Sequence, residues 1–277
     1  EKTVSNKQVD ERFWKPEVDA SGNGYAVIRF LPAPDGETVP WAKVYSHAFQ
    51  GPGGWYIENS LTTIGDKDPV GEVNRRLWNS GEDADKDTAR KQKRKLSYYS
   101  NIYVVKDPKH PENEGKVFLY KYGKKIHDKI LAAMQPEFQD ETPVNVFDLW
   151  EGANFKLKIK KVAGFWNYDS SEFDSISALS ADDTELEATW KSEHSLEAFT
   201  AADQFKSYED LEKRLNLVLG SAPRPTAPSV DSEEYEPVAP PQSDFRAKMS
   251  APTPVKQEAV VEDDDALSYF ASLASDD

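Results

Sequence analysis

Alternating apolar and polar residues predict several short β-strands separated by turns rich in glycine and proline. The first confident strand, YAVIRFLP, starts at Tyr25 after the turn at residues 21–24. The segments WAKVYSHAF and WYIE flank the turn at residues 50–54 and predict a hairpin. FKLKIKKV, from Phe155, alternates apolar residues with lysines, which is typical of a half-buried strand with a basic outer face. Another strand is expected at VNVFDLW, residues 144–150.

Aromatic and β-branched residues predict two more strands in the middle of the chain. These are YYSNIYVV, residues 98–105, and VFLYKY, residues 117–122. In the second strand, Phe118, Tyr120 and Tyr122 alternate with other residues. The three rings are therefore expected on one face of that strand.

Spacings of three and four residues predict helices in three places. One short helix is expected in a polar insertion, residues 60–88, and another in IHDKILAAM, with one buried face. From Asp169 the pattern becomes acidic and helical, and Ser207 with Asp210 resembles a capping box before a helix that stops at Gly220. The apolar positions of the three helices are Val70, Val73 and Leu77; Ile126, Ile130 and Met134; and Tyr208, Leu211, Leu215 and Leu219.

These elements predict a mainly β protein with accessory helices in four parts. Residues 1–19 form an N-terminal arm, truncated or atypical, which Phe13 and Trp14 anchor. Residues 20–168 fit an OB-fold, a five-stranded Greek-key barrel. Residues 169–220 form an acidic helical region packed on this core. Residues 221–277 hold eight of the 18 prolines and few aliphatic residues, so a disordered acidic tail is expected, ending in a short peptide for docking on partners.

Composition excludes several classes of protein. The chain of 277 residues has no cysteine, which excludes disulfides and argues against a structural zinc finger. No apolar run approaches the roughly 20 residues that a membrane-spanning helix needs. The N-terminus lacks the apolar core of a signal peptide, so we expect an intracellular protein without a membrane partner.

Charge is distributed unevenly along the chain. The total is −15, but residues 1–168 carry +2, residues 169–220 carry −9 and residues 221–277 carry −8. The stretch from Arg90 to Lys129 holds 12 basic and 4 acidic side chains, a local net charge of +8. The acidic total therefore does not exclude an anionic ligand for the core.

Basic and aromatic residues alternate as groups within that stretch. A single nucleic-acid strand presents phosphates and unstacked bases, so a protein that binds it without sequence preference needs cations beside flat rings. For any one residue, a solvated loop or a core position is the simpler interpretation, but the cluster favours a nucleic-acid surface. Its members are Arg90, Lys91, Lys93, Arg94, Lys95, Tyr98, Tyr99, Tyr103, Tyr120, Lys121, Tyr122 and Lys124.

Longer strings of residues carry a family resemblance. GNGYAVIRFLP, GGWYIE, LSYYSNIYVVKDPKHPENEGKVFLYKYGKKIHDKI, WEGANFKLKIKKVAGFWNYD and FKSYEDL resemble successive segments of the single-stranded DNA-binding, helix-destabilising proteins of T-even-like tailed bacteriophages, over about residues 13–220. The resemblance implies an OB-fold core that coats single-stranded DNA during replication, recombination and repair in the cytoplasm of the infected host. It also implies copies of itself along the strand as partners, and an acidic tail that recruits DNA polymerase, helicase/primase and a recombination mediator.

The resemblance implies particular contacts with DNA. The aromatic contacts of the family fall on Tyr98, Tyr99, Tyr120, Phe165 and Tyr168. The basic contacts fall on Lys93, Arg94 and Lys95, with Arg29 and Trp55 as further positions.

Two departures from the family pattern change the expectations. The family holds zinc through one histidine and three cysteines, whereas this chain has His47, Ser60, Val70 and Val73 at those positions. We therefore expect no zinc and no other cofactor, with apolar packing of Val70, Val73 and Leu77 in its place. The basic arm through which neighbouring family members touch is not recognisable before Phe13, which leaves cooperative binding open.

Two other functions compete with this interpretation. A metal-dependent nuclease would need paired carboxylates near the basic surface, but Asp107, Glu112, Glu114 and Asp128 are scattered, so an enzyme is not expected. An RNA-binding or translational regulatory module stays open, because stacking on aromatic rings does not distinguish ribose from deoxyribose.

Overall fold

The computed structural model describes residues 10–220, so the predicted tail and the first nine residues lie outside the described part. The fold is mainly β, with one sheet of nine strands and several helices. The strands are β1 (Phe13–Trp14), β2 (Gly24–Phe30), β3 (Ala42–Gly51), β4 (Gly54–Asn59), β5 (Lys95–Lys106), β6 (Val117–Tyr122), β7 (Ala153–Val162), β8 (Phe165–Asn167) and β9 (Glu172–Ile176). The helices are α1 (Pro69–Asn79), α2 (Asp83–Lys91), α3 (Lys124–Met134), α4 (Asp183–Lys191) and α5 (Tyr208–Leu219), with 3-10 turns η1 (Leu61–Ile64), η2 (Pro111–Asn113), η3 (Glu197–Phe199) and η4 (Ala202–Gln204).

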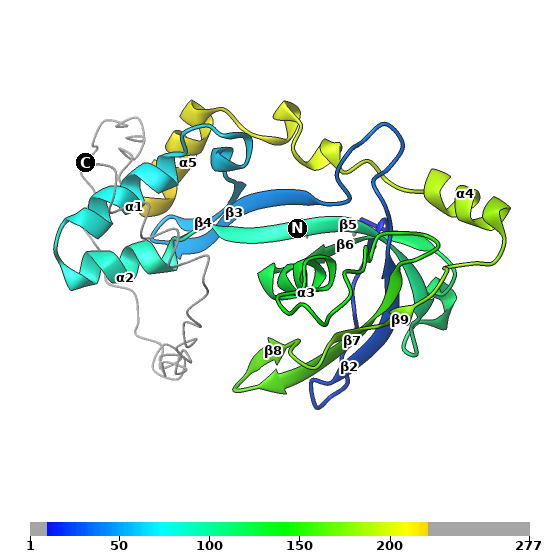
Figure 1. The fold of residues 1–277 in the computed structure, drawn as a ribbon. Coiled ribbons are helices and arrows are strands. Elements are labelled where there is room, and N and C mark those ends of the chain that lie inside the picture. The colour runs from blue at the N-terminus through cyan, green and yellow to red at the C-terminus, as the bar shows by residue number, and fades with distance from the viewer. Residues whose placement is uncertain (1–9, 221–277) are drawn as a thin grey trace, which may run out of the picture.

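The long strand β5 connects two parts of the sheet. The main path runs β1-β6-β5-β2-β7-β8, and β9 also pairs with β7. The first residues of β5 pair with β3, and β3 forms a hairpin with β4. Figure 1 shows this hairpin and the start of β5 extending from the rest of the sheet toward α1, α2 and α5.

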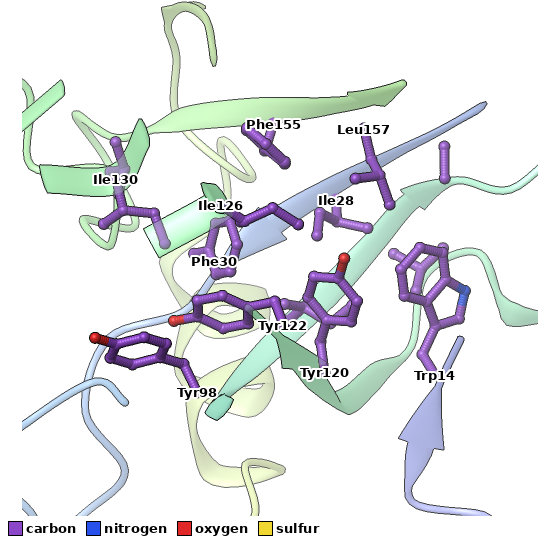
Figure 2. Packing of buried hydrophobic residues seen from close by; sticks show 14 of the residues in the cluster. Trp14, Ile28, Phe30, Tyr98, Tyr120, Tyr122, Ile126, Ile130, Phe155 and Leu157 are labelled. Carbon is purple, nitrogen blue, oxygen red and sulfur yellow. The ribbon is translucent and has the colours of Figure 1, made fainter. Parts of the chain in front are cut away.

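The main core is rich in aromatic residues and lies between the central strands and α3. Ile126 and Ile130 of α3 are buried in it, and Met134 packs against it, as the helical spacing predicted. Figure 2 shows the rings of Tyr98, Tyr120 and Tyr122 within this cluster, beside Phe30, Ile126 and Trp14.

A second core forms under the extended hairpin. Phe49 and Tyr56 of the hairpin pack with Val70 of α1 and with Leu211 and Leu215 of α5. The side chain of Asp68 caps the N-terminus of α1, that of Ser207 caps α5, and α5 ends at Gly220 with φ 73°. The predicted helices at these two places are confirmed.

Three expectations about secondary structure were wrong. Residues 144–150 form turns, not a strand, because the Asn145 and Asp148 side chains accept hydrogen bonds from the following backbone amides. Residues 172–176 form strand β9, although this region was expected to be helical. The polar insertion holds a second helix, α2, which has one buried residue, Ala89, and therefore no clear apolar period. Within residues 10–220, no helix combines the length and apolar character needed to cross a bilayer.

Candidate nucleic-acid interface

The basic run at residues 90–95 lies where α2 ends and β5 begins. Arg90, Lys91 and Lys95 are exposed, whereas Lys93 and Arg94 are half-buried. Cations in the last turn of α2 are favourable because the C-terminal end of a helix carries partial negative charge. The run is thus held by a helix end and a strand start, not by a free loop.

Arg94 stacks on an aromatic ring of β3. Its guanidinium carbon lies 3.8 Å from the ring centroid of Tyr45, and its Nη1 donates a 2.9 Å hydrogen bond to Thr62 Oγ1. Lys43 Nζ lies 5.2 Å from the centroid of the same ring. Stacked guanidinium and aromatic planes are surfaces on which unpaired bases stack.

Lys43 and Tyr45 were not among the predicted contacts. In the segment AKVY, Ala42 and Val44 are buried, so Lys43 and Tyr45 share the opposite face of β3. That alternation was visible in the sequence. What the sequence did not show is that this face of β3 meets Arg94, which comes from the other side of the polar insertion.

Neighbouring tyrosines of β5 point to opposite faces of the sheet. Tyr98 is 6% exposed and stacks on His127 of α3 with ring centroids 3.8 Å apart. Tyr99 is half-buried and stacks on Phe199, with centroids 4.3 Å apart, while Lys121 Nζ lies 5.7 Å from the Tyr99 ring. One nucleic-acid strand cannot follow a single face of the sheet and touch both tyrosines.

Four predicted contacts are buried in the fold. Tyr98, Tyr120 and Tyr122 belong to the main core, where burial raises the pKa of Tyr120 and Tyr122 (Figure 2). Arg29 is fully buried, and its Nη2 donates 2.8 Å hydrogen bonds to the carbonyls of Asp148 and Ser177. Contact with DNA would require these side chains to become exposed, so their role as direct contacts stays a prediction.

The other predicted positions are spread over four parts of the fold. Phe165 and Tyr168 come from the β7–β8 hairpin and the turn after it, where Tyr168 packs against the main core. Trp55 is 53% exposed on β4. Tyr103 packs against a separate cluster beside α4, and Lys124 forms a 2.8 Å ion pair with Asp128 at the start of α3.

The residues at the family's zinc position do not fit a zinc ion. His47 Nε2 lies 3.3 Å from Asp68 Oδ1, and its Nδ1 donates to the carbonyl of Gln92 over 3.0 Å, so both ring nitrogens are already used. Ser60 Oγ lies 2.9 Å from Thr62 Oγ1, and Val70 is buried in the second core. A structural zinc site needs about four nitrogen or sulfur ligands. Here a buried histidine–aspartate pair and apolar packing occupy the position.

The acidic residues near the basic surface have structural partners. Asp107 Oδ2 accepts from Trp14 Nε1 at 2.8 Å, Glu114 accepts from the Asp107 amide, and Asp128 pairs with Lys124. Across residues 10–220, no three histidine, aspartate or glutamate side chains come together as a metal site would require. The described residues therefore contain no assembled metal-dependent catalytic centre.

The sequence of the chain is similar to a known protein family and to several individual proteins. Residues 22–219 match the family model described as gp32 DNA binding protein like. The chain is 43% identical to the single-stranded DNA-binding protein of Enterobacteria phage T2 over 233 residues, which are 83% of this chain and 77% of that protein. It is 42% identical to the protein of the same name from Enterobacteria phage T4 over the same length and shares. A shorter match, 49% over 59 residues, covers 21% of this chain and 52% of the single-stranded DNA-binding protein of Escherichia phage SV14.

Proposed function

Because the chain belongs to the gp32 DNA-binding-protein-like family, we propose that it binds single-stranded DNA without sequence preference and coats it during phage replication, recombination and repair. The observation that carries this proposal is the stack of Arg94 on Tyr45, with Lys43 beside it and the basic run at residues 90–95 next to it. This arrangement pairs cations with an aromatic plane, as a single strand requires.

We further propose that the strands around β5 form an OB-fold. β5 pairs with β3 through its first residues and with β2 and β6 through its later ones, which supports a strand that turns the corner of a closed Greek-key barrel. Residues 20–168 would be the DNA-binding core with its insertion at 60–88, and residues 169–220 a region packed on it. Residues 1–19 would be the arm.

We also propose protein partners and a cellular location for the chain. Residues 221–277, which lie outside the described residues, would be a disordered acidic tail that recruits polymerase, helicase/primase and recombination proteins. Other copies of the chain along the strand are further proposed partners, and the infected host's cytoplasm is the proposed location. We propose no catalytic activity and no cofactor.

A titration of labelled single-stranded and duplex DNA at two salt concentrations tests the function. We expect tight binding to single strands, weak binding to the duplex, and a log–log salt slope of about −0.7 for each phosphate contacted. Equal affinity for the two forms would contradict the proposal. Matched RNA oligomers as competitors test the RNA-binding alternative, and cleavage in the presence of Mg²⁺ would reveal a nuclease.

A further inference from the structure

The β7–β8 hairpin ends in an exposed tryptophan. Trp166 is 46% exposed, and Val162 across the turn is 54% exposed. Trp166 pairs directly with Lys161, and Asn167 pairs with Lys160. Directly paired residues share a face of the sheet, so an aromatic ring and an ammonium group are neighbours at this tip.

The lysines of β7 differ in what surrounds them. Lys156 lies 3.1 Å from Asp174 and Lys158 lies 2.8 Å from Glu172, both carboxylates coming from β9. β9 pairs with β7 only as far as Lys156, and beyond it the hairpin partner is β8. Lys160 and Lys161 are exposed, and neither forms an ion pair with any residue between 10 and 220. The positive charge at the tip is therefore not neutralised locally.

The turn of the hairpin is short and fixed. Its two central residues, Ala163 and Gly164, have φ of 50° and 89°. Two positive φ angles are typical of the type I′ turn, whose twist matches that of paired strands. At the base, Tyr168 packs on the main core and Lys129 Nζ of α3 donates to the Asp169 carbonyl over 3.0 Å. The exposed ring is thus held on an anchored element that projects from the sheet (Figure 1).

We propose that this tip, defined as Lys160, Lys161 and Trp166, is an additional contact for a single DNA strand. Trp166 stacks on one unpaired base, and Lys161, which shares its face of the hairpin, neutralises a flanking phosphate. Lys160 lies on the opposite face with Asn167 and adds to the positive charge of the tip. This inference rests on the proposed function and adds a contact that the family resemblance did not assign.

Exposure of the ring alone would not support the contact, as a second tryptophan shows. Trp150 is 54% exposed, but its Nε1 donates to Asp183 Oδ1 at 2.9 Å, and Glu187 lines the same pocket. Carboxylates there would repel phosphate. Trp150 is therefore the matched control for Trp166.

The test compares Trp166→Ala, Trp166→Phe and Trp150→Ala in the full chain, by fluorescence anisotropy with labelled oligothymidine. We expect Trp166→Ala to weaken binding about 5- to 150-fold, since loss of one stacked base has an effect of this size. Trp166→Phe should stay close to wild type, and Trp150→Ala should bind as the wild type does. The double variant Lys160→Ala/Lys161→Ala should flatten the salt slope by about 0.7 per lost phosphate contact, more than Lys156→Ala/Lys158→Ala does.

A second measurement does not depend on the alanine variants folding. Binding of oligothymidine should quench less tryptophan fluorescence in Trp166→Phe than in Trp150→Phe, because only the first variant removes a stacked indole. Equal quenching in the two variants, or equal affinity of folded Trp166→Ala and Trp150→Ala, overturns the inference while leaving the proposed function intact. A wild-type chain that does not prefer single strands overturns the proposed function itself.

Discussion

Burial separates tyrosines that look alike in the sequence. Tyr45 is half-buried beside two cations, whereas Tyr120 is 3% exposed and packs edge-on against Trp14 with centroids 5.3 Å apart. A ring that already has packing partners on its faces stabilises the fold. A ring at the surface is able to stack on a ligand.

Alanine at these two positions should therefore have different effects. Tyr45→Ala should weaken single-strand binding by about 1–3 kcal/mol, the cost of one stacked base, with little change in melting temperature. Tyr120→Ala should lower the free energy of unfolding by about 3–5 kcal/mol, as truncation of a core aromatic does. DNA titration and urea unfolding of both variants measure the two effects. A Tyr120→Ala protein of wild-type stability would contradict this assignment.

His47 and Asp68 form a buried pair at the position where the family holds zinc. Asp68 accepts hydrogen bonds from the amides of Leu61, Val70 and Gly71 as well as facing His47. Burial opposes ionisation of Asp68, but the bonds from His47 and the backbone outweigh it and lower its pKa. The pair therefore joins β3, η1 and the start of α1 without a metal.

Removal of one partner should be costly, and removal of metal should have no effect. We expect His47→Ala or Asp68→Ala to lose about 3–5 kcal/mol of stability, because the remaining buried group is left unpaired. The wild-type melting temperature should be the same with and without a zinc chelator. One tightly bound zinc per chain in elemental analysis would refute the argument that His47 and Asp68 replace the metal site.

At the scale of elements, the segment from α4 to η3 crosses one face of β5. Asn101 of β5 exchanges two hydrogen bonds with the backbone of His194, at 2.8 and 2.9 Å. Glu37 accepts from Ser195 Oγ and from the Leu196 amide, and Phe199 covers Tyr99. This segment therefore covers one face of the Tyr99 ring.

Glu193 in this segment makes stability depend on pH. Its carboxylate oxygens are buried without a hydrogen bond from the described residues, and burial together with the charge of Glu37 raises its pKa to about 9. An unfolded glutamate ionises near pH 4.3, so between about pH 4.3 and 9 unfolding releases a proton. Stability contributed by protonated Glu193 is complete below that interval and is lost as the pH rises through it.

Glu193→Gln should remove this dependence. The variant should be more stable than wild type at pH 8.5, and this gain in stability should be much smaller at pH 5.5. Between the two pH values the gain should grow by at most about 1.4 kcal/mol per pH unit. Thermal unfolding at the two pH values measures the difference. The exposed Glu197→Gln in the same segment is the control, and equal gains for both variants would contradict a specific role for Glu193.

At the scale of the whole molecule, one stretch of an acidic chain carries a large net positive charge. The total is −15, whereas residues 90–129 carry +8. Each cation that neutralises a phosphate releases counterions and adds to the salt dependence of binding. The triple variant Lys93→Ala/Arg94→Ala/Lys95→Ala should therefore flatten the log–log salt slope. An unchanged slope would remove this run from the interface.

The acidic tail, which lies outside the described residues, carries charge opposite in sign to that of residues 90–129. The proposed tail, residues 221–277, has a net charge of −8, and as a disordered segment tethered to the core it would compete with DNA for the basic surface at high effective concentration. Truncation after Gly220 should tighten binding most at low salt, because ions screen the tail at higher salt. It should also abolish recruitment of partner proteins with little change in the core's melting temperature. Unchanged affinity of the truncated chain at low salt would leave the tail only its docking role.

The sequence by itself determined the features that depend on local pattern. Alternation located β2, the β3–β4 hairpin and β7, and aromatic and β-branched residues located β5 and β6. Helical spacing located α1, α3 and α5, because it reflects which face a helix buries. Clustered charge and rings indicated the ligand class. The strand predicted at residues 144–150 is absent because side-chain hydrogen bonds form turns there. The strand at residues 172–176 was missed because its pairing with β7 is not visible in the pattern that the local sequence shows.

Only the tertiary structure decided which rings and cations are accessible and which lie together. Alternation shows that Tyr98 and Tyr99 point to opposite faces, but not that α3 covers one and Phe199 the other. Nor does it show that Arg94 reaches Tyr45, or that β9 neutralises some lysines of β7 and leaves those at the tip unpaired. These facts depend on contacts between segments far apart in the chain, and burial is a property of the packed molecule.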